Sequence, residues 1–189
     1  MKKNFDSDSQ ILILSDSMLI LTYKGKTPKI SHSAFIAPGA VIIGDVEIGD
    51  HASIWFGCIV RGDVNHIRIG AGTNIQDNSV VHVTRKTGPT IIGAGITIGH
   101  QVVIHAATLE DGCFIGMHST ILDGAVVESG GMIAAGAMVS PHKRIPKGQI
   151  WAGNPAKFLR EMRQEEIDYI KTSEQRYIEL AGEYRNKGT

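Results

Sequence analysis

The chain has 189 residues, with 19 Lys plus Arg and 19 Asp plus Glu, so its formal net charge at neutral pH is zero. This length predicts one domain of ordinary size with a short appendage, and the charge balance excludes the strong basic field that attracts nucleic acids and anionic membranes. The two cysteines, Cys58 and Cys113, are too few for a disulfide framework, which favours a reducing compartment.

The first segment, residues 1–26, is predicted to be an N-terminal extension followed by a leading strand. Residues 1–17 contain two lysines and an apolar stretch, but a Ser-Asp-Ser sequence interrupts the stretch and no small-residue cleavage site follows. Met18 then opens a new apolar stretch. Because no run is long enough to span a bilayer, we expect a cytoplasmic protein without membrane contact.

From Ile36 onward the sequence repeats with a period of six residues. Steps such as IAPGAV, IIGDVE and IWFGCI begin with an aliphatic residue and carry a small residue four positions later. This pattern is typical of a parallel β-helix, in which each step forms one side of a triangular coil and its leading residue points inward. We assign residues 27–154 to this β-helix. The predicted core is Ile36, Ile42, Ile48, Ile54, Val60, Ile69, Ile75, Val81, Ile92, Ile98, Ile104, Leu109, Ile115, Ile121, Val127, Ile133 and Val139, with Ala52, Cys58, Cys113 and Ala125 as small inward residues.

The repeat is interrupted in two places, where extra residues separate consecutive inward positions. One interruption lies between Val60 and Ile69, and the other lies between Val81 and Ile92 around TRKTGPT. We predict that both segments leave the coil as loops. Functional residues of repeat proteins often lie on such excursions.

Polar residues that follow inward positions are expected to form ladders on the outside of the coil. Three steps complete one turn, so residues of every third step stack about 4.8 Å apart. One ladder contains Arg61, His82 and His105, and a second ladder, around the corner, contains Gln76, Asp77 and His100. Cyclic threefold packing sets one side of each chain against a different side of its neighbour. Three histidines with an open fourth position form the catalytic zinc pattern, so we predict a metal site between subunits.

After the last coil, a Gly-Asn-Pro turn ends the repeat. From about Pro155, apolar residues recur at helical spacing among charged ones, which predicts an amphipathic helix along the coil or across the oligomer. We therefore assign residues 155–189 to a C-terminal helical segment. Trp55 and Trp151 are interpreted as packing residues.

The sequence RGD at 61–63, NIQD at 74–77, His82 and GHxxxxH at 99–105 match, in order and spacing, the pattern of gamma-class carbonic anhydrases. From about Thr27 to the C-terminal helix, the chain resembles this hexapeptide-repeat family of left-handed β-helix homotrimers. The resemblance implies that one metal is bound by His82 and His105 of one subunit and by His100 of its neighbour. The metal is usually Zn²⁺, with Fe²⁺ or Co²⁺ also used.

The resemblance also implies roles for polar residues around the metal. Gln76 orients the metal-bound hydroxide, Asn74 lies near it, and Tyr177 on the C-terminal helix reaches the site. A half-buried packing tyrosine stays open as the alternative for Tyr177. The residues assigned to ion pairs between subunits are Arg61, Asp63 and Asp77, with a solvated surface pair as the alternative for the first two.

The reaction implied by the resemblance is that of a lyase, the reversible hydration of carbon dioxide to bicarbonate by attack of a zinc-bound hydroxide. Such a hydroxide is available near pH 7 because zinc lowers the pKa of its bound water. The chain departs from the best-known members at the residues that carry the released proton. Val64 stands where those members have a glutamate, and the loop VTRKTGPT contains no acid.

Two other functions stay open on the same fold. An acyl-CoA thioesterase or acyltransferase would use a histidine base, although such enzymes usually need one catalytic histidine rather than three clustered ones. A non-catalytic trimeric protein would keep the metal as a structural element. The expected partners are further copies of the chain and a small-molecule substrate, with no nucleic acid and no membrane.

Overall fold

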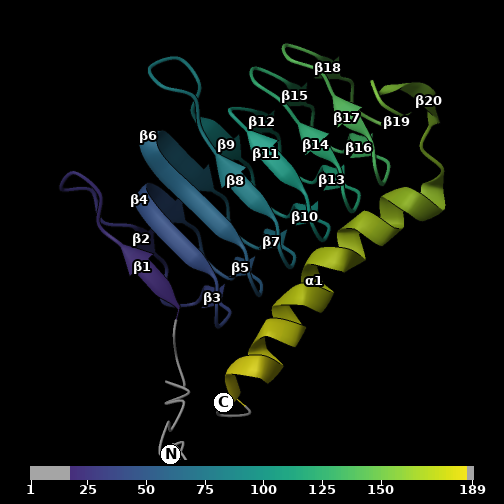
Figure 1. Cartoon of the computed structure of the whole chain (residues 1–189). Coiled ribbons are helices and arrows are strands. Elements are labelled where there is room, and N and C mark those ends of the chain that lie inside the picture. Colours follow the sequence, from purple (N-terminus) through teal and green to yellow (C-terminus); the bar gives the residue numbers. More distant parts are fainter. Residues whose placement is uncertain (1–17, 187–189) are drawn as a thin grey trace, which may run out of the picture.

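The computed structural model describes residues 18–186, which form a parallel β-helix with one long α-helix lying along it (Figure 1). The predicted extension at residues 1–17 lies outside the described residues. Within residues 18–186 every strand pairing is parallel except that between the last two strands. The fold class expected from the hexapeptide repeat is confirmed.

Two sheets make up the coil, and successive strands in each come from successive turns. The 12-stranded sheet contains β1 Leu19–Leu21, β2 Lys29–Ile30, β4 Val41–Ile48, β6 Ile59–Ile69, β8 Val80–His82, β9 Thr90–Ile92, β11 Val103–His105, β12 Thr108–Leu109, β14 Thr120–Ile121, β15 Val126–Val127, β17 Met138–Val139 and β18 Arg144–Ile145. The 8-stranded sheet contains β3 Phe35–Ile36, β5 Ser53–Ile54, β7 Asn74–Ile75, β10 Thr97–Ile98, β13 Phe114–Ile115, β16 Met132–Ile133, β19 Gln149–Ala152 and β20 Lys157–Glu161.

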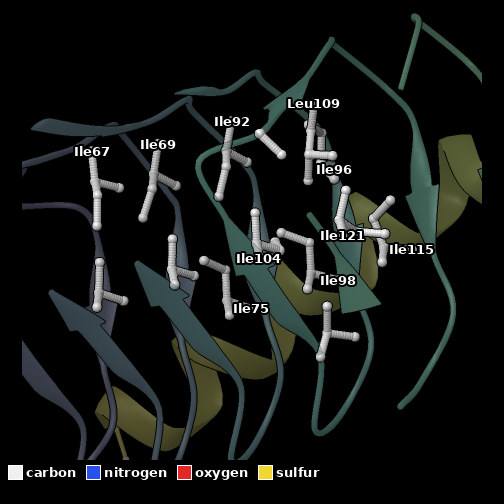
Figure 2. Packing of buried hydrophobic residues seen from close by; sticks show 14 of the residues in the cluster. Ile67, Ile69, Ile75, Ile92, Ile96, Ile98, Ile104, Leu109, Ile115 and Ile121 are labelled. Atoms are coloured by element: carbon white, nitrogen blue, oxygen red, sulfur yellow. The ribbon is translucent and has the colours of Figure 1, made fainter. Parts of the chain in front are cut away.

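The interior of the coil confirms the predicted core. Every aliphatic residue predicted to lead a step, and each of the four small inward residues, is buried. Parallel register stacks equivalent residues, so that Ile75, Ile98 and Ile115 follow one another in neighbouring strands (Figure 2). Burial raises the pKa of the Cys58 thiol to about 11, which agrees with a packing role for this cysteine rather than a reactive one.

The first interruption of the repeat is not a loop, and that prediction was wrong. Residues 59–69 form one continuous strand, β6, which pairs along its length with β4 and then with β8 and β9 in turn. β4 and β6 both pass round a corner of the coil at a register shift beside Gly44. The extra residues stay in the sheet because Ile67 points inward and is fully buried.

The second interruption leaves the coil as predicted. An antiparallel bridge between Thr84 and Gly88 closes a short turn between β8 and β9. This turn lies next to the end of β8, where His82 is the last residue. The excursion therefore begins beside one of the predicted metal ligands.

The C-terminal segment begins as a strand and continues as helix α1, Gln164–Asn186. The helix starts later than the expected Pro155 because residues 157–161 form β20 and pair antiparallel with β19. Helix α1 lies along the 8-stranded sheet, over β3, β5 and β10 (Figure 1), and buries Ile170, Ser173 and Ala181. Among residues 18–186 no helix combines the length and apolarity that a bilayer crossing requires.

Candidate metal centre

His82 and His105 lie side by side at the ends of β8 and β11. The strand register pairs the two residues directly, as the ladder count predicted. Because Val81 and Ile104 point into the coil, the residues that follow them point outward. Nδ1 of His82 lies 3.2 Å from Nε2 of His105.

The spacing of these two nitrogens fits a shared metal ion. A tetrahedral zinc with bonds of about 2.0–2.1 Å to histidine holds two ligand nitrogens about 3.3 Å apart. The observed separation of 3.2 Å matches this value, and it equally allows one ring to donate a hydrogen bond to the other. Among residues 18–186 no group of three His, Cys, Asp or Glu side chains is arranged so that it could hold a metal ion. One chain thus presents two of the three predicted donors together.

A carboxylate holds the remaining nitrogen of each ring. Asp63 Oδ1 lies 3.0 Å from Nε2 of His82, and Asp123 Oδ1 lies 2.6 Å from Nδ1 of His105. The other oxygen of Asp63 accepts a hydrogen bond from Arg61. Metal-binding histidines commonly have such carboxylate partners, which set the ring orientation and the tautomer. Each ring therefore keeps one nitrogen available on the side where the two rings meet.

The hydrogen-bond partners of Asp63 and Asp123 stabilise the ionised form of both carboxyl groups. Partial burial acts to raise the pKa of Asp63, but the hydrogen bonds from His82 and Arg61 outweigh it, so this pKa lies below its usual range. Burial likewise opposes ionisation of Asp123, and hydrogen bonds from Thr84 and His105 lower its pKa overall. Two anionic carboxylates behind the rings strengthen the imidazoles as donors to a cation.

Asp123 is a site residue that the sequence analysis missed. It lies after β14, which follows β11 in the sheet and pairs Ile121 with Ile104. The next rung of the histidine ladder is Leu122, and Asp123 is one residue beyond it, so counting coils alone does not lead to this residue. Thr84 donates a hydrogen bond to its second oxygen, so Asp123 also ties the excursion loop to the histidine pair.

His100 lies on a different part of the coil, in the turn that follows β10. Its Nδ1 is 2.8 Å from Asp77 Oδ2, and its side chain is 46% exposed. The pairing of Ile98 with Ile75 places His100 level with Asp77 in the neighbouring coil, one residue beyond Gln76. Since Asp77 occupies Nδ1, Nε2 is the nitrogen that His100 offers to a further partner.

A cleft of about 480 Å³ lies beside His100, between the 8-stranded sheet and helix α1. Gln76 and Tyr177 line it together with His100, and Met117 and Leu159 supply exposed apolar walls. Gln76 is buried and its Nε2 donates a hydrogen bond to Asn74 Oδ1 at 3.1 Å. The predicted catalytic residues therefore lie on the side of the coil that carries His100.

Tyr177 packs edge-on against Trp55, with ring centroids 5.6 Å apart. Partial burial, with Tyr169 and Asp77 as neighbours, raises the pKa of its hydroxyl. In one chain it contacts neither His82 nor His105, and it reaches the cleft of His100 instead. Trp55 is almost fully buried beneath α1, in keeping with the packing role predicted for it.

The residues predicted to form ion pairs between subunits have partners within one chain. Arg61 pairs with Asp63, and Asp77 pairs with His100. Val64 packs against the hydrophobic core. The chain therefore shows no acid at the position of the family's glutamate, and the carboxylate near the excursion loop is that of Asp123.

Comparison with known proteins gives matches across most of the chain. The family description Bacterial transferase hexapeptide (six repeats) matches residues 27–62. Gamma carbonic anhydrase 2, mitochondrial, from Arabidopsis thaliana is 50% identical over 173 residues, which are 89% of this chain and 62% of that protein. The chain thus spans less than two thirds of the length of this relative.

Two further relatives are covered nearly completely. Carbonic anhydrase from Geobacillus kaustophilus is 44% identical over 88% of this chain and 91% of its own length. The crystal structure of a hexapeptide transferase family protein from Anaplasma phagocytophilum is 49% identical and superimposes with a TM-score of 0.85, over 88% of this chain and 98% of that one. Close to nine tenths of this chain therefore has a counterpart in each of these proteins.

Proposed function

This chain belongs to the gamma carbonic anhydrase family of left-handed β-helices, and we propose that it catalyses the reversible hydration of carbon dioxide to bicarbonate. The observation that carries the proposal is the His82–His105 pair, whose facing nitrogens are 3.2 Å apart and whose other nitrogens are held by carboxylates. We place Zn²⁺ here, with Fe²⁺ or Co²⁺ as alternatives. His100 of a neighbouring subunit is the third donor.

A surface beside the histidine pair supports assembly into a homotrimer. The outward positions of neighbouring strands stack in the order Val41, Ile59, Val80 and Val103. Of these, Ile59 and Val103 are 39% and 38% exposed. Exposed apolar rows on a soluble surface commonly mark a contact with another chain. A ring of three subunits closed by heterologous contacts would cover this apolar row and bring His100 of one subunit to the histidine pair of its neighbour. Arg61, Asp63 and Asp77 would then lie at the interface.

The chemistry divides between the metal and the chain. When bound, zinc lowers the pKa of a coordinated water to about 7, which supplies a nucleophile at neutral pH. Asp63 and Asp123 hold the imidazoles, Gln76 orients the attacking water, and Asn74 holds Gln76. Tyr177 closes one wall of the cleft. The water attacks the carbon of carbon dioxide, and its proton leaves to solvent.

Proton release is the step at which this chain differs from the family's pattern. Val64 is apolar and packs on the core, so it cannot accept the proton. We therefore expect external buffer to carry it, and turnover to rise with buffer concentration. The cytoplasmic location stays a prediction of the sequence.

The size of the cleft favours one second candidate, hydrolysis of an acyl-CoA thioester. A volume of about 480 Å³ with the apolar residues Met117 and Leu159 exceeds what carbon dioxide fills. Pockets of this size commonly hold larger ligands. His100 at its edge would serve as the base.

The test is stopped-flow hydration of carbon dioxide by protein loaded separately with zinc, cobalt or anaerobic iron, with metal content measured. His105→Ala removes a proposed ligand, and His32→Ala, at an exposed turn, is the matched control. We expect metal-dependent hydration that only His105→Ala abolishes. Metal bound at one per subunit without hydration by any form would show that the reaction is wrong. Thiol release from an acyl-CoA would then identify the second candidate, and its absence would favour a non-catalytic metal-binding trimer.

A further inference from the structure

A column of polar side chains lies buried beneath helix α1. The outward residues Asn74 and Thr97 face the helix from neighbouring strands β7 and β10, and Ser173 faces them from α1. Their exposed fractions are 0%, 3% and 3%. Polar groups this deeply buried destabilise a fold unless they are hydrogen-bonded. The hydrogen bonds of these three side chains are therefore a requirement of the fold at this place.

These residues form one continuous chain of hydrogen bonds that ends at Gln76. Ser173 Oγ lies 2.7 Å from Thr97 Oγ1. Asn74 Nδ2 donates to the same Thr97 oxygen at 3.0 Å. Gln76 Nε2 donates to Asn74 Oδ1 at 3.1 Å. A residue of the helix is thus linked to a residue of the proposed site.

The backbone carbonyl of Ile96 sets the direction of the hydrogen bonds that the Asn74 side chain makes. It lies 3.4 Å from Asn74 Nδ2, and a carbonyl oxygen can only accept. The nitrogen of the Asn74 amide must therefore face Ile96 and Thr97, and its oxygen must face Gln76. Gln76 has to present Nε2 to that oxygen, which leaves its Oε1 for the cleft. Thr97 accepts from Asn74, and its hydroxyl shares a further hydrogen bond with that of Ser173, in which either oxygen can be the donor.

We propose that Ser173 and Thr97 are positioning residues that hold the Gln76 amide with Oε1 toward the cleft, so that Gln76 serves there as a hydrogen-bond acceptor. Resting on the proposed function, this gives Gln76 a defined task. It accepts a hydrogen bond from one O–H of the attacking water, which aims the lone pair of that water at the carbon. A reversed amide would present N–H groups to the water and lose this alignment.

A purely structural role for the same hydrogen bonds is the competing explanation, because they also attach α1 to the coil. The two explanations differ in what they change. Loss of attachment lowers stability, whereas loss of positioning lowers kcat without changing KM and frees the side-chain amides of Asn74 and Gln76 to exchange their protons.

The test uses four variants of the full chain. Thr97→Val and Ser173→Ala remove the hydroxyls, Thr97→Ser restores one, and Thr172→Ala removes an exposed hydroxyl that bonds only within the helix. The measurements are kcat and KM for hydration, metal content, and side-chain amide exchange of Asn74 and Gln76 by nitrogen-15 NMR. If Thr97→Val does not fold, Ser173→Ala carries the test from the helix side.

We expect Thr97→Val to lower kcat by about fivefold to tenfold, the effect of one lost buried hydrogen bond, with KM and metal content unchanged and amide exchange faster. Thr97→Ser should have the kcat and the amide exchange rates of the wild type. Thr172→Ala should not change either quantity. Unchanged amide exchange in both Thr97→Val and Ser173→Ala would overturn the proposal. If the loaded wild type does not hydrate carbon dioxide, the proposed function fails, and amide exchange alone still decides the positioning role.

Discussion

The Asp123 carboxylate lies 2.6 Å from Nδ1 of His105, across two adjacent coils. This contact places the ring proton of His105 on Nδ1 and leaves the lone pair of Nε2 facing His82. Thr84, from the excursion loop, holds the second oxygen of the same carboxylate. The orientation of a proposed ligand is therefore set by residues that lie outside the motifs of the family.

Replacing Asp123 by alanine should weaken metal binding. Loss of a partner behind a metal-binding histidine typically lowers affinity by about 10- to 100-fold. The affinity is measured by competition with a chromophoric chelator. Asp168→Asn, at an exposed position of α1, is the control and should bind metal as the wild type does. Equal affinities in all three proteins would show that Asp123 does not support His105.

Mixing two inactive variants should restore activity. In a ring, His100→Ala keeps the His82–His105 pair and His105→Ala keeps His100, so each mixed trimer contains one intact site. When equal amounts reassemble at random, about three quarters of the trimers are mixed, and each of these has one intact site out of three. The mixture should therefore recover about a quarter of wild-type activity. The measurement is hydration activity after joint unfolding and refolding. A mixture as inactive as its components would show that neighbouring subunits do not share the site in this way.

Val103→Lys should dissociate the trimer. Val103 is 38% exposed and belongs to the apolar row beside the histidine pair. A lysine buried there without a partner loses its hydration, which disfavours association. Val126→Lys, on β15 of another side of the coil, is the matched control. Light scattering after size-exclusion chromatography should report a monomer for the first and a trimer for the second, and the opposite result would move the interface to the β15 side.

The stability supplied by Glu166 should depend on pH. Its carboxylate accepts hydrogen bonds from Arg160 and from the N–H of Arg163, and these lower its pKa to about 2 from 4.5. A carboxyl with a depressed folded-state pKa stabilises the fold fully above its unfolded pKa and loses this effect as the pH falls to the folded one.

Glu166→Gln should therefore lower Tm by a few degrees at pH 7, and the gap from wild type should close as the pH falls from about 5 toward 2. Thermal unfolding followed by circular dichroism measures this. Glu165→Gln, an exposed acid one position earlier, controls for the general effect of a charge in the first helical turn. A gap that does not vary with pH would assign the effect of Glu166 to packing.

Gly44→Ala should destabilise the protein more than Gly39→Ala. Both glycines have a φ of +79°, so alanine carries the same backbone strain at each. A Cβ at Gly44 would lie 2.3 Å from the carbonyl oxygen of Gly62, whereas the nearest atom at Gly39 is 4.0 Å away. The difference in the free energy of unfolding should be about 2 kcal/mol, measured by chemical denaturation at equal protein concentration. Equal effects would mean that the corner of β4 and β6 moves freely.

The two interruptions of the repeat show where sequence reasoning stops. Around TRKTGPT, turn-forming residues predicted a loop correctly. Between Val60 and Ile69, extra residues also predicted a loop, but the buried side chain of Ile67 lets the segment continue as a strand around the corner. Counting residues gives the length of an insertion, whereas its path depends on which side chains the interior accepts.

The residue at which helix α1 starts also depends on an interaction that forms only in the folded chain. The charged and apolar residues after Pro155 are compatible with either a helix or an edge strand. Residues 157–161 become β20 because β19 offers an unpaired edge at the end of the coil. This edge exists only after the coil has formed.

The sequence by itself determined the coil, its core and the two ladders, because a six-residue period constrains each side chain locally to point in or out. It also placed His82 beside His105, since parallel register follows from counting turns. Only the tertiary structure decided that Asp123 holds His105 and that Ser173 is linked to Gln76 through Thr97 and Asn74. The hydrogen bond between Ser173 and Thr97 joins residues 76 positions apart. Such contacts depend on how the helix and the loops pack in three dimensions, which no local period encodes.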